Sequence, residues 1–215
     1  MTEREWLAST DVRVMLQLVI GMRGMRVAMP SDPGHSLSAY TFVPRYSDRK
    51  LRLLACAVFR SNTVHNSGSY FRKDQESYAK KCESWADGGP ELPADQYFYY
   101  IGNRNATLAA ETMVENAVGN QEYVADILRC LFGNPFRPSG LSRVGPEWAL
   151  QGSPWRTPYH MARMIYDERR WADLPILADM LEEAGCDDAD VLAHLRGPGP
   201  HARGCWVLDL ILGKE

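Results

Sequence analysis

The stretch from Tyr159 to Glu215 constrains the fold most, because amphipathic helical patterns alternate there with strong stop signals. Leu174, Leu177 and Leu181 recur at helical spacing, and Gly185 stands where a left-handed residue usually ends a helix. Helix starts are predicted at Thr157 with Pro158, at Asp173, at Asp187 or Asp188, and at Cys205. The final helix, Cys205 to Leu212, is apolar on nearly all sides. We therefore expect a four-helix C-terminal cassette over residues 159–215.

Helical periodicity also dominates the N-terminal part, and alternating runs of β-branched residues are almost absent. Thr2 and Glu5 have the spacing of a capping box, and Thr10 or Asp11 can cap the next helix. Further helices are predicted from Ser47 to about Ser61, from Ser69 to Trp85, from Ala94 to Val118 and from Gln121 to Phe132. These patterns predict an all-α fold, a multi-helix orthogonal bundle.

Two segments rich in proline and glycine interrupt the helical pattern. Residues 25–46 contain three prolines and predict a long irregular insertion near the N-terminus. Residues 139–158 contain three more prolines beside several glycines and predict a connector. The expected organisation is a helical region over 1–138, the connector over 139–158 and the cassette over 159–215, all forming one compact unit.

Charge and cysteine usage narrow the function classes. The net charge of −3 and the pI near 6.0 give no overall field that attracts nucleic acid or anionic lipid. The N-terminus lacks a secretory pattern, and no apolar run has the roughly 20 residues that cross a bilayer. Five cysteines without a CxxC pair predict reduced thiols rather than a disulfide framework. We expect a cytoplasmic protein without a membrane segment.

Several phrases of the chain resemble a known group of proteins. They are Thr2 to Leu7, Ser47 to Leu53, Phe132 to Pro138, Ile165 to Arg169 and the run from Leu174 to Glu215. Together they resemble a helical paralogous family expanded in planctomycete bacteria. The Tyr-Asp-Glu-Arg and Leu-Glu-Glu-Ala-Gly phrases are also similar to the short repeat-companion domain of the same bacteria. The resemblance implies a helical fold and a bacterial cytosol, and it transfers no catalytic residue.

One set of side chains has the composition of a zinc site. Cys186, His194, His201 and Cys205 supply two thiols and two imidazoles, which is the ligand set of many structural zinc sites. Their spacing differs from that of a zinc finger, and Cys186 and His194 fall at opposite ends of one short predicted helix. The alternative is that the cysteines are small core residues and the histidines ordinary polar residues near helix ends. We favour this alternative, and with it no metal and no cofactor.

A second set suggests an anion site before the last helix. His201 and Arg203, with Trp206 and Asp209 nearby, can hold a carboxylate or phosphate ligand together with free backbone N–H groups. Asp209 is the only charged residue inside the apolar last helix, so it needs a partner if it is buried. The favoured interpretation is that Arg203 pairs with Asp209.

Motifs for catalysis are missing from the sequence. It contains no Gly-x-Ser-x-Gly elbow, no P-loop and no dinucleotide-binding glycine turn, so no catalytic residue is assigned. Aromatic residues at 97–100, Trp148, Trp155 and Trp171 suggest a contact surface. We expect a non-enzymatic protein-interaction, scaffold or adaptor module whose partner is another protein. The alternative is a zinc-supported helical domain with possible hydrolytic activity.

A nucleic-acid-binding accessory protein is the third reading of the sequence. Basic residues gather in two short runs, one around Arg49 and one around Lys80, and aromatic residues lie near both. The negative net charge of the chain disfavours nucleic acid as a partner.

Overall fold

The computed structural model describes residues 1–21, 26–27, 41–42, 46–65, 72–92, 101–102, 105–117, 119–137 and 152–214. The helices in these residues are α1 Glu3–Ala8, α2 Val12–Gly21, α3 Asp48–His65, α4 Arg72–Ala86, α5 Ala106–Glu115, α6 Gln121–Phe132, α7 Arg156–Glu168, the 3-10 helix η3 Trp171–Asp173, α8 Leu174–Glu183, α9 Ala189–Arg196 and α10 Trp206–Leu212. The predicted all-α fold is confirmed. The orthogonal crossing of the helices stays a prediction.

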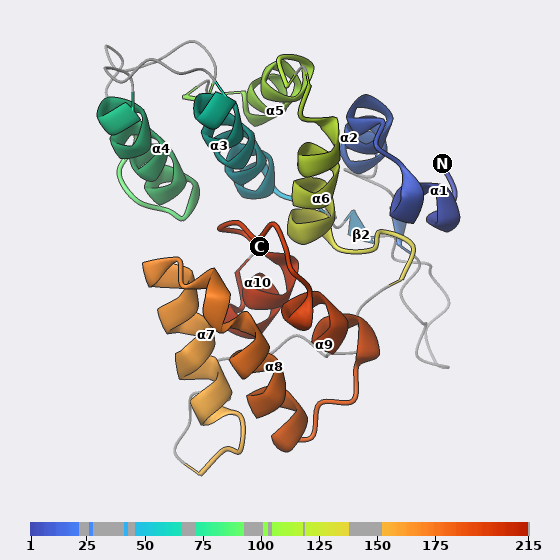
Figure 1. The fold of residues 1–215 in the computed structure, drawn as a ribbon, viewed down its shortest axis with the longest axis vertical. Coiled ribbons are helices and arrows are strands. Elements are labelled where there is room, and N and C mark those ends of the chain that lie inside the picture. The colour runs from blue at the N-terminus through green and yellow to red at the C-terminus, as the bar shows by residue number, and fades with distance from the viewer. Residues whose placement is uncertain are drawn as a thin grey trace.

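The helices pack around two hydrophobic cores. Helices α1 to α6 enclose the first core, in which Trp6, Leu54 and Leu128 are fully buried. Helices α7 to α10 enclose the second core, which also takes in Cys130 from α6. Figure 1 shows α1 to α6 in one group, α7 to α10 in the other, and α10 at the junction beside α6. The division of the chain into a helical region, connector and cassette stays a prediction.

Several predicted helix ends are confirmed. The Thr2 hydroxyl accepts from the Glu5 N–H at 3.3 Å, and the Glu5 carboxylate accepts from the Thr2 N–H at 2.6 Å, which completes the capping box. Asp11 accepts from the Val14 N–H at the start of α2. Asp188 accepts from two N–H groups in the first turn of α9. These contacts satisfy helix N–H groups that lack a partner inside the helix.

The predicted helix from Ala94 to Val118 is wrong in its extent. Residues 101–102 form a turn, and α5 begins only at Ala106, where Asn105 caps two N–H groups. Gly102 lies so close to Tyr78 that an added Cβ would stand 2.2 Å from the tyrosine hydroxyl. The tertiary contact with α4 therefore outweighs the local helical pattern.

The two proline-rich segments lie largely outside the described residues. Within 25–46 the structure describes β1 Arg26–Val27 and β2 Thr41–Phe42, which pair antiparallel. At the end of the predicted connector, α7 begins at Arg156 rather than after Thr157. The Ser153 hydroxyl accepts from the Trp155 N–H at 3.2 Å, and the resulting turn starts the helix early.

Helix α10 is buried on most sides, as its composition predicts. Val207, Leu208, Asp209 and Ile211 are all buried. In the described part of the chain, no helix combines the length and the apolar character needed to span a bilayer. The cytoplasmic location stays a prediction.

Candidate metal centre

Two cysteines and two histidines converge where α6 meets the C-terminal cassette. Cys130, His194, His201 and Cys205 each offer one ligand atom, and these atoms all lie within 4.8 Å of one another. Both cysteines are buried, and both histidines are half-buried. Cys130 belongs to α6, His194 to the last turn of α9, and His201 and Cys205 to the segment between α9 and α10. The cluster therefore joins three separate parts of the chain.

The spacing of the ligand atoms fits a small tetrahedral ion. His194 Nε2 lies 3.2 Å from Cys205 Sγ, and His201 Nδ1 lies 3.8 Å from Cys130 Sγ. Tetrahedral zinc with Zn–S bonds of about 2.3 Å and Zn–N bonds of about 2.0–2.1 Å holds its ligand atoms roughly 3.3–3.8 Å apart. Only small side-chain shifts separate this arrangement from such a site.

The ring orientation of His201 is fixed by a backbone carbonyl. Its Nε2 lies 3.3 Å from the carbonyl oxygen of Gly197, which can only accept a hydrogen bond. The proton therefore belongs on Nε2, and the Nδ1 lone pair faces Cys130. Zinc-binding histidines usually have such a partner on the nitrogen that does not bind metal.

The electrostatics of the cluster favour a thiolate. Burial acts to raise the pKa of the Cys205 thiol, but Cys130, His194 and His201 outweigh burial and hold that pKa well below its ordinary value. The hydrogen bond to Cys205, together with burial, raises the pKa of Cys130. The cluster therefore stabilises one thiolate, and the thiolate is the form of cysteine that binds metals.

The segment that carries His201 and Cys205 is closely fitted to the helices around it. Gly204 has a φ of +91°, and a Cβ there would stand 2.8 Å from Leu131 in α6 and 2.8 Å from Leu53 in α3. The Gly204 carbonyl accepts from Lys50 Nζ at 2.6 Å. The packing of Gly204 therefore holds Cys205 against α6 without the help of a metal ion.

The structure brings together three of the four residues that the sequence singled out for zinc, and Cys130 takes the place of Cys186. Cys186 follows α8 and lies before the start of α9, whereas His194 lies in the last turn of α9. A helix of eight residues is about 12 Å long, which separates the two side chains. Cys186 is instead a buried thiol of the second core.

A buried ion network lies near this cluster. Arg49 of α3 donates to both Asp209 oxygens at 2.7 and 2.9 Å, to Asp87 at 2.8 Å and to the Tyr166 hydroxyl at 2.6 Å. Lys50 Nζ lies 2.6 Å from Asp209. The predicted pairing of Arg203 with Asp209 is therefore wrong, because α3 places two cations against Asp209 and leaves Arg203 for Asp87 at 2.7 Å.

The residues predicted to form one anion site lie in different surroundings. His201 is part of the metal cluster, whereas Arg203 pairs with Asp87. Trp206 packs against Gly133 and lies 5.6 Å from the His194 ring. Asp209 is enclosed by the cations of α3. These four side chains do not converge on one ligand.

Two other sequence features take structural roles in the described part of the chain. Arg49 and Lys50, from the first basic run, are buried in ion pairs, and Arg52 stacks on Trp85 at 3.9 Å. The described residues of this run therefore present no open surface to a phosphate backbone, and Arg45 lies outside the described residues. Trp155 and Trp171 pack partly buried against the second core, while residues 97–100 and Trp148 lie outside the described residues.

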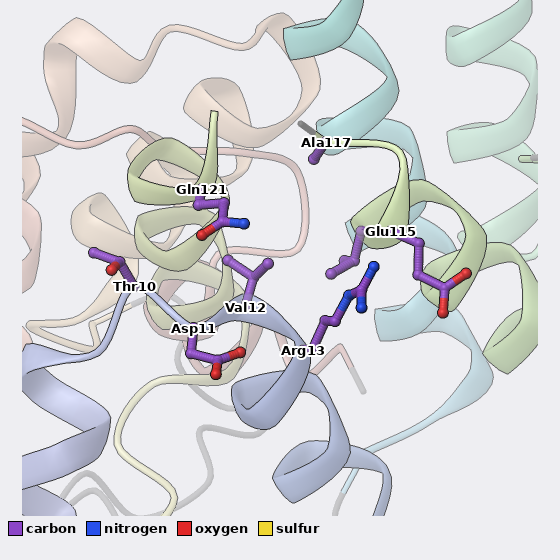
Figure 2. A pocket seen from close by; sticks show the side chains of 8 residues that line it. Thr10, Asp11, Val12, Arg13, Glu115, Ala117 and Gln121 are labelled. Carbon is purple, nitrogen blue, oxygen red and sulfur yellow. The ribbon is translucent and has the colours of Figure 1, made fainter. Parts of the chain in front are cut away.

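A hollow of about 460 Å³ lies between the start of α2, the end of α5 and the start of α6. Figure 2 shows exposed polar side chains around it, among them Asp11, Arg13 and Glu115. Asp11 already caps α2, and the lining includes neither histidine nor cysteine. Its composition gives no reason to assign chemistry to it.

The carboxylate of Asp87 makes stability depend on pH. Burial acts to raise its pKa, but Arg49, Arg203 and Lys214 outweigh burial and hold that pKa below its ordinary value. A lowered pKa contributes stability that is fully present above the unfolded-state value of about 3.9 and is lost as the pH falls through the folded-state value.

We therefore expect the stability difference between the wild type and Asp87→Asn to stay constant from pH 7 to about pH 5 and to shrink at lower pH. Urea unfolding of both proteins from pH 7 to pH 3 measures this difference. A difference that stays level over the whole range contradicts the expectation.

Comparison with known proteins gives no relative. No family model, no curated protein and no solved structure matches the chain. The resemblance to the planctomycete family stays a prediction, and the function rests on the residues alone.

Proposed function

We propose that the protein binds one zinc ion through Cys130, His194, His201 and Cys205, and that it acts as a zinc-supported helical module without catalytic activity. The observation that carries the proposal is the approach of two thiols and two imidazoles to within 4.8 Å from three parts of the chain. Zinc is the metal that typically binds to such a set in a tetrahedral arrangement. The ion would tie α6 to the segment between α9 and α10.

The donor set supports a structural rather than a hydrolytic role. Catalytic zinc sites usually have three protein ligands and leave the fourth position to water, whereas structural sites have four protein ligands. Here four protein ligands are close enough to fill a tetrahedral shell, and Cys130 and Cys205 are buried. Hydrolysis by this site is therefore not part of the proposal.

We further propose that the protein acts as a scaffold or adaptor in the cytoplasm. A cytosol keeps cysteine thiols reduced, which the cluster needs in order to bind metal. All five cysteines are free and buried. A helical unit held by a metal presents fixed surfaces to another protein.

Metal content tests the proposal. The protein of residues 1–215, purified with zinc and without chelator, is expected to contain one zinc per chain by elemental analysis. Cobalt(II) in place of zinc is expected to give the intense visible absorption of a tetrahedral site and the charge-transfer band of cobalt–thiolate bonds. Cys130→Ala and Cys205→Ala should each lose the stoichiometric metal.

Cys186→Ala is the matched control, because Cys186 is also a buried cysteine of the second core but lies outside the cluster. This variant should keep one zinc per chain. Folded wild-type protein without stoichiometric zinc, or equal loss of zinc in all three variants, contradicts the proposal.

A further inference from the structure

A second group of charged side chains lies around Tyr166, apart from the metal ligands. Arg203 and Lys214 lie 4.6 and 4.9 Å from the centroid of the Tyr166 ring. Both also contact the Asp87 carboxylate, Arg203 through Nε at 2.7 Å and Lys214 through Nζ at 4.0 Å. One aromatic ring and one carboxylate thus hold two cations in place.

Positive charge exceeds negative charge in this group. The four cations Arg49, Lys50, Arg203 and Lys214 share two carboxylates, those of Asp87 and Asp209. The C-terminal ends of α4 and α10 lie beside the group and offset about half a charge each. Among the described residues a surplus of roughly one positive charge remains, and partly buried charge of this kind favours a counterion.

A ligand can reach only two of these four cations, Arg203 and Lys214. Arg49 and Lys50 are directed at Asp209, Asp87 and backbone carbonyls, and their side chains are about one-tenth exposed. In the described part of the chain, the terminal nitrogens of Arg203 donate no hydrogen bond to a carboxylate, and Lys214 Nζ makes no hydrogen bond. Their side chains are 17% and 32% exposed, which admits the tip of a ligand.

We propose that Arg203 and Lys214 form a binding site for a single carboxylate group, supplied by an aspartate or glutamate side chain of a partner protein. A guanidinium binds two carboxylate oxygens in a planar fork, and one carboxylate neutralises a surplus of one charge. The narrow access suits the end of a side chain. The site is separate from the candidate zinc site, because neither cation is one of the four candidate ligands.

Titrations of the isotope-labelled, zinc-saturated protein of residues 1–215 test the site. The probes are a tri-glutamate peptide with blocked ends, sodium acetate and inorganic phosphate, with sodium chloride at matched ionic strength as the reference. The peptide is expected to give saturable shifts of the Arg203 side-chain N–H and the Lys214 amide resonances. Acetate should give the same shifts at higher concentration. Saturation by acetate at concentrations as low as for the peptide identifies a free small carboxylate as the ligand and overturns the partner side chain.

Three variants separate binding from folding. Lys214→Gln should weaken peptide binding about tenfold, the loss expected for one charge-assisted hydrogen bond, and should leave the zinc content unchanged. Arg203→Lys keeps a cation beside Asp87 but loses the fork, so it should also weaken binding. Lys80→Gln, on an exposed part of α4, is the control and should bind like the wild type. Shifts that match those of sodium chloride, that saturate in Lys214→Gln at the wild-type peptide concentration, or that saturate more tightly with phosphate overturn the proposal.

Discussion

Arg49→Met is expected to lower the free energy of unfolding by about 3–5 kcal/mol, because the change removes four hydrogen bonds and leaves their buried acceptor atoms on Asp87, Asp209 and Tyr166 without this donor. The Arg49 guanidinium joins α3 to Asp87 after α4, to Tyr166 in α7 and to Asp209 in α10. Methionine keeps much of the volume of the side chain and removes its charge. Chemical denaturation followed by circular dichroism measures the loss.

Arg196→Met is the matched control for this prediction. Arg196 also contacts two carboxylates, those of Asp179 and Glu182, but this cluster lies on the surface. Exposed ion pairs contribute little because solvent screens them, so this variant should unfold at nearly the wild-type denaturant concentration. Equal losses in the two variants would show that burial does not make the Arg49 network important.

A double-mutant cycle sharpens the test. Asp209→Asn removes the carboxylate that accepts two of the Arg49 hydrogen bonds. The two residues contact each other directly. The sum of the stability losses of the two single variants should therefore exceed the stability loss of the double variant. Additive losses would place the effect of Arg49→Met elsewhere in the network.

Local signals in the sequence predicted the helix ends well. The capping box of Thr2 and Glu5 and the cap at Asp188 depend on groups within three residues of one another. The extent of α6, Gln121–Phe132, was also predicted, because its apolar stripe and the following Gly133 are local features. Where a tertiary contact decides, as at Gly102 against Tyr78, the local pattern failed.

The partners of the buried charged residues could not be predicted from the sequence. The need of Asp209 for a partner was visible, since it is the charged residue of an apolar helix. The partner itself, Arg49, is 160 positions away, and no spacing rule connects positions so distant. The need of a buried aspartate for a cation predicts a pair of Arg203 with Asp209, whereas the tertiary structure places Arg49 and Lys50 of α3 against Asp209.

The candidate zinc ligands could likewise be predicted only in part from the sequence. His194, His201 and Cys205 lie close together in the sequence and were singled out, whereas Cys130 precedes His201 by 71 positions. A thiol in the apolar stripe of α6 has the pattern of an ordinary core cysteine. Cys130 becomes recognisable only when α6 is packed against the segment before α10.

Removal of zinc is expected to destabilise the protein by about 4 kcal/mol when free zinc in the reference state is about a thousandfold above its dissociation constant. The ion binds the folded chain, in which the four ligands converge, far better than the unfolded chain, in which they are dispersed. Thermal unfolding of zinc-saturated and chelator-treated protein at one pH measures the effect.

The variants show whether the effect belongs to this cluster. Cys205→Ala should unfold at the same temperature with and without chelator, because it lacks a thiolate ligand, whereas Cys186→Ala should respond to chelator as the wild type does. Hydrogen exchange should locate the response in the end of α6 and in the segment between α9 and α10, since these carry the ligands. The same segment supplies Arg203 to Asp87 and the Gly204 carbonyl to Lys50, so zinc removal should also loosen the contact between the two cores. A chelator response of equal size in Cys205→Ala and the wild type would assign the stabilising metal to another site.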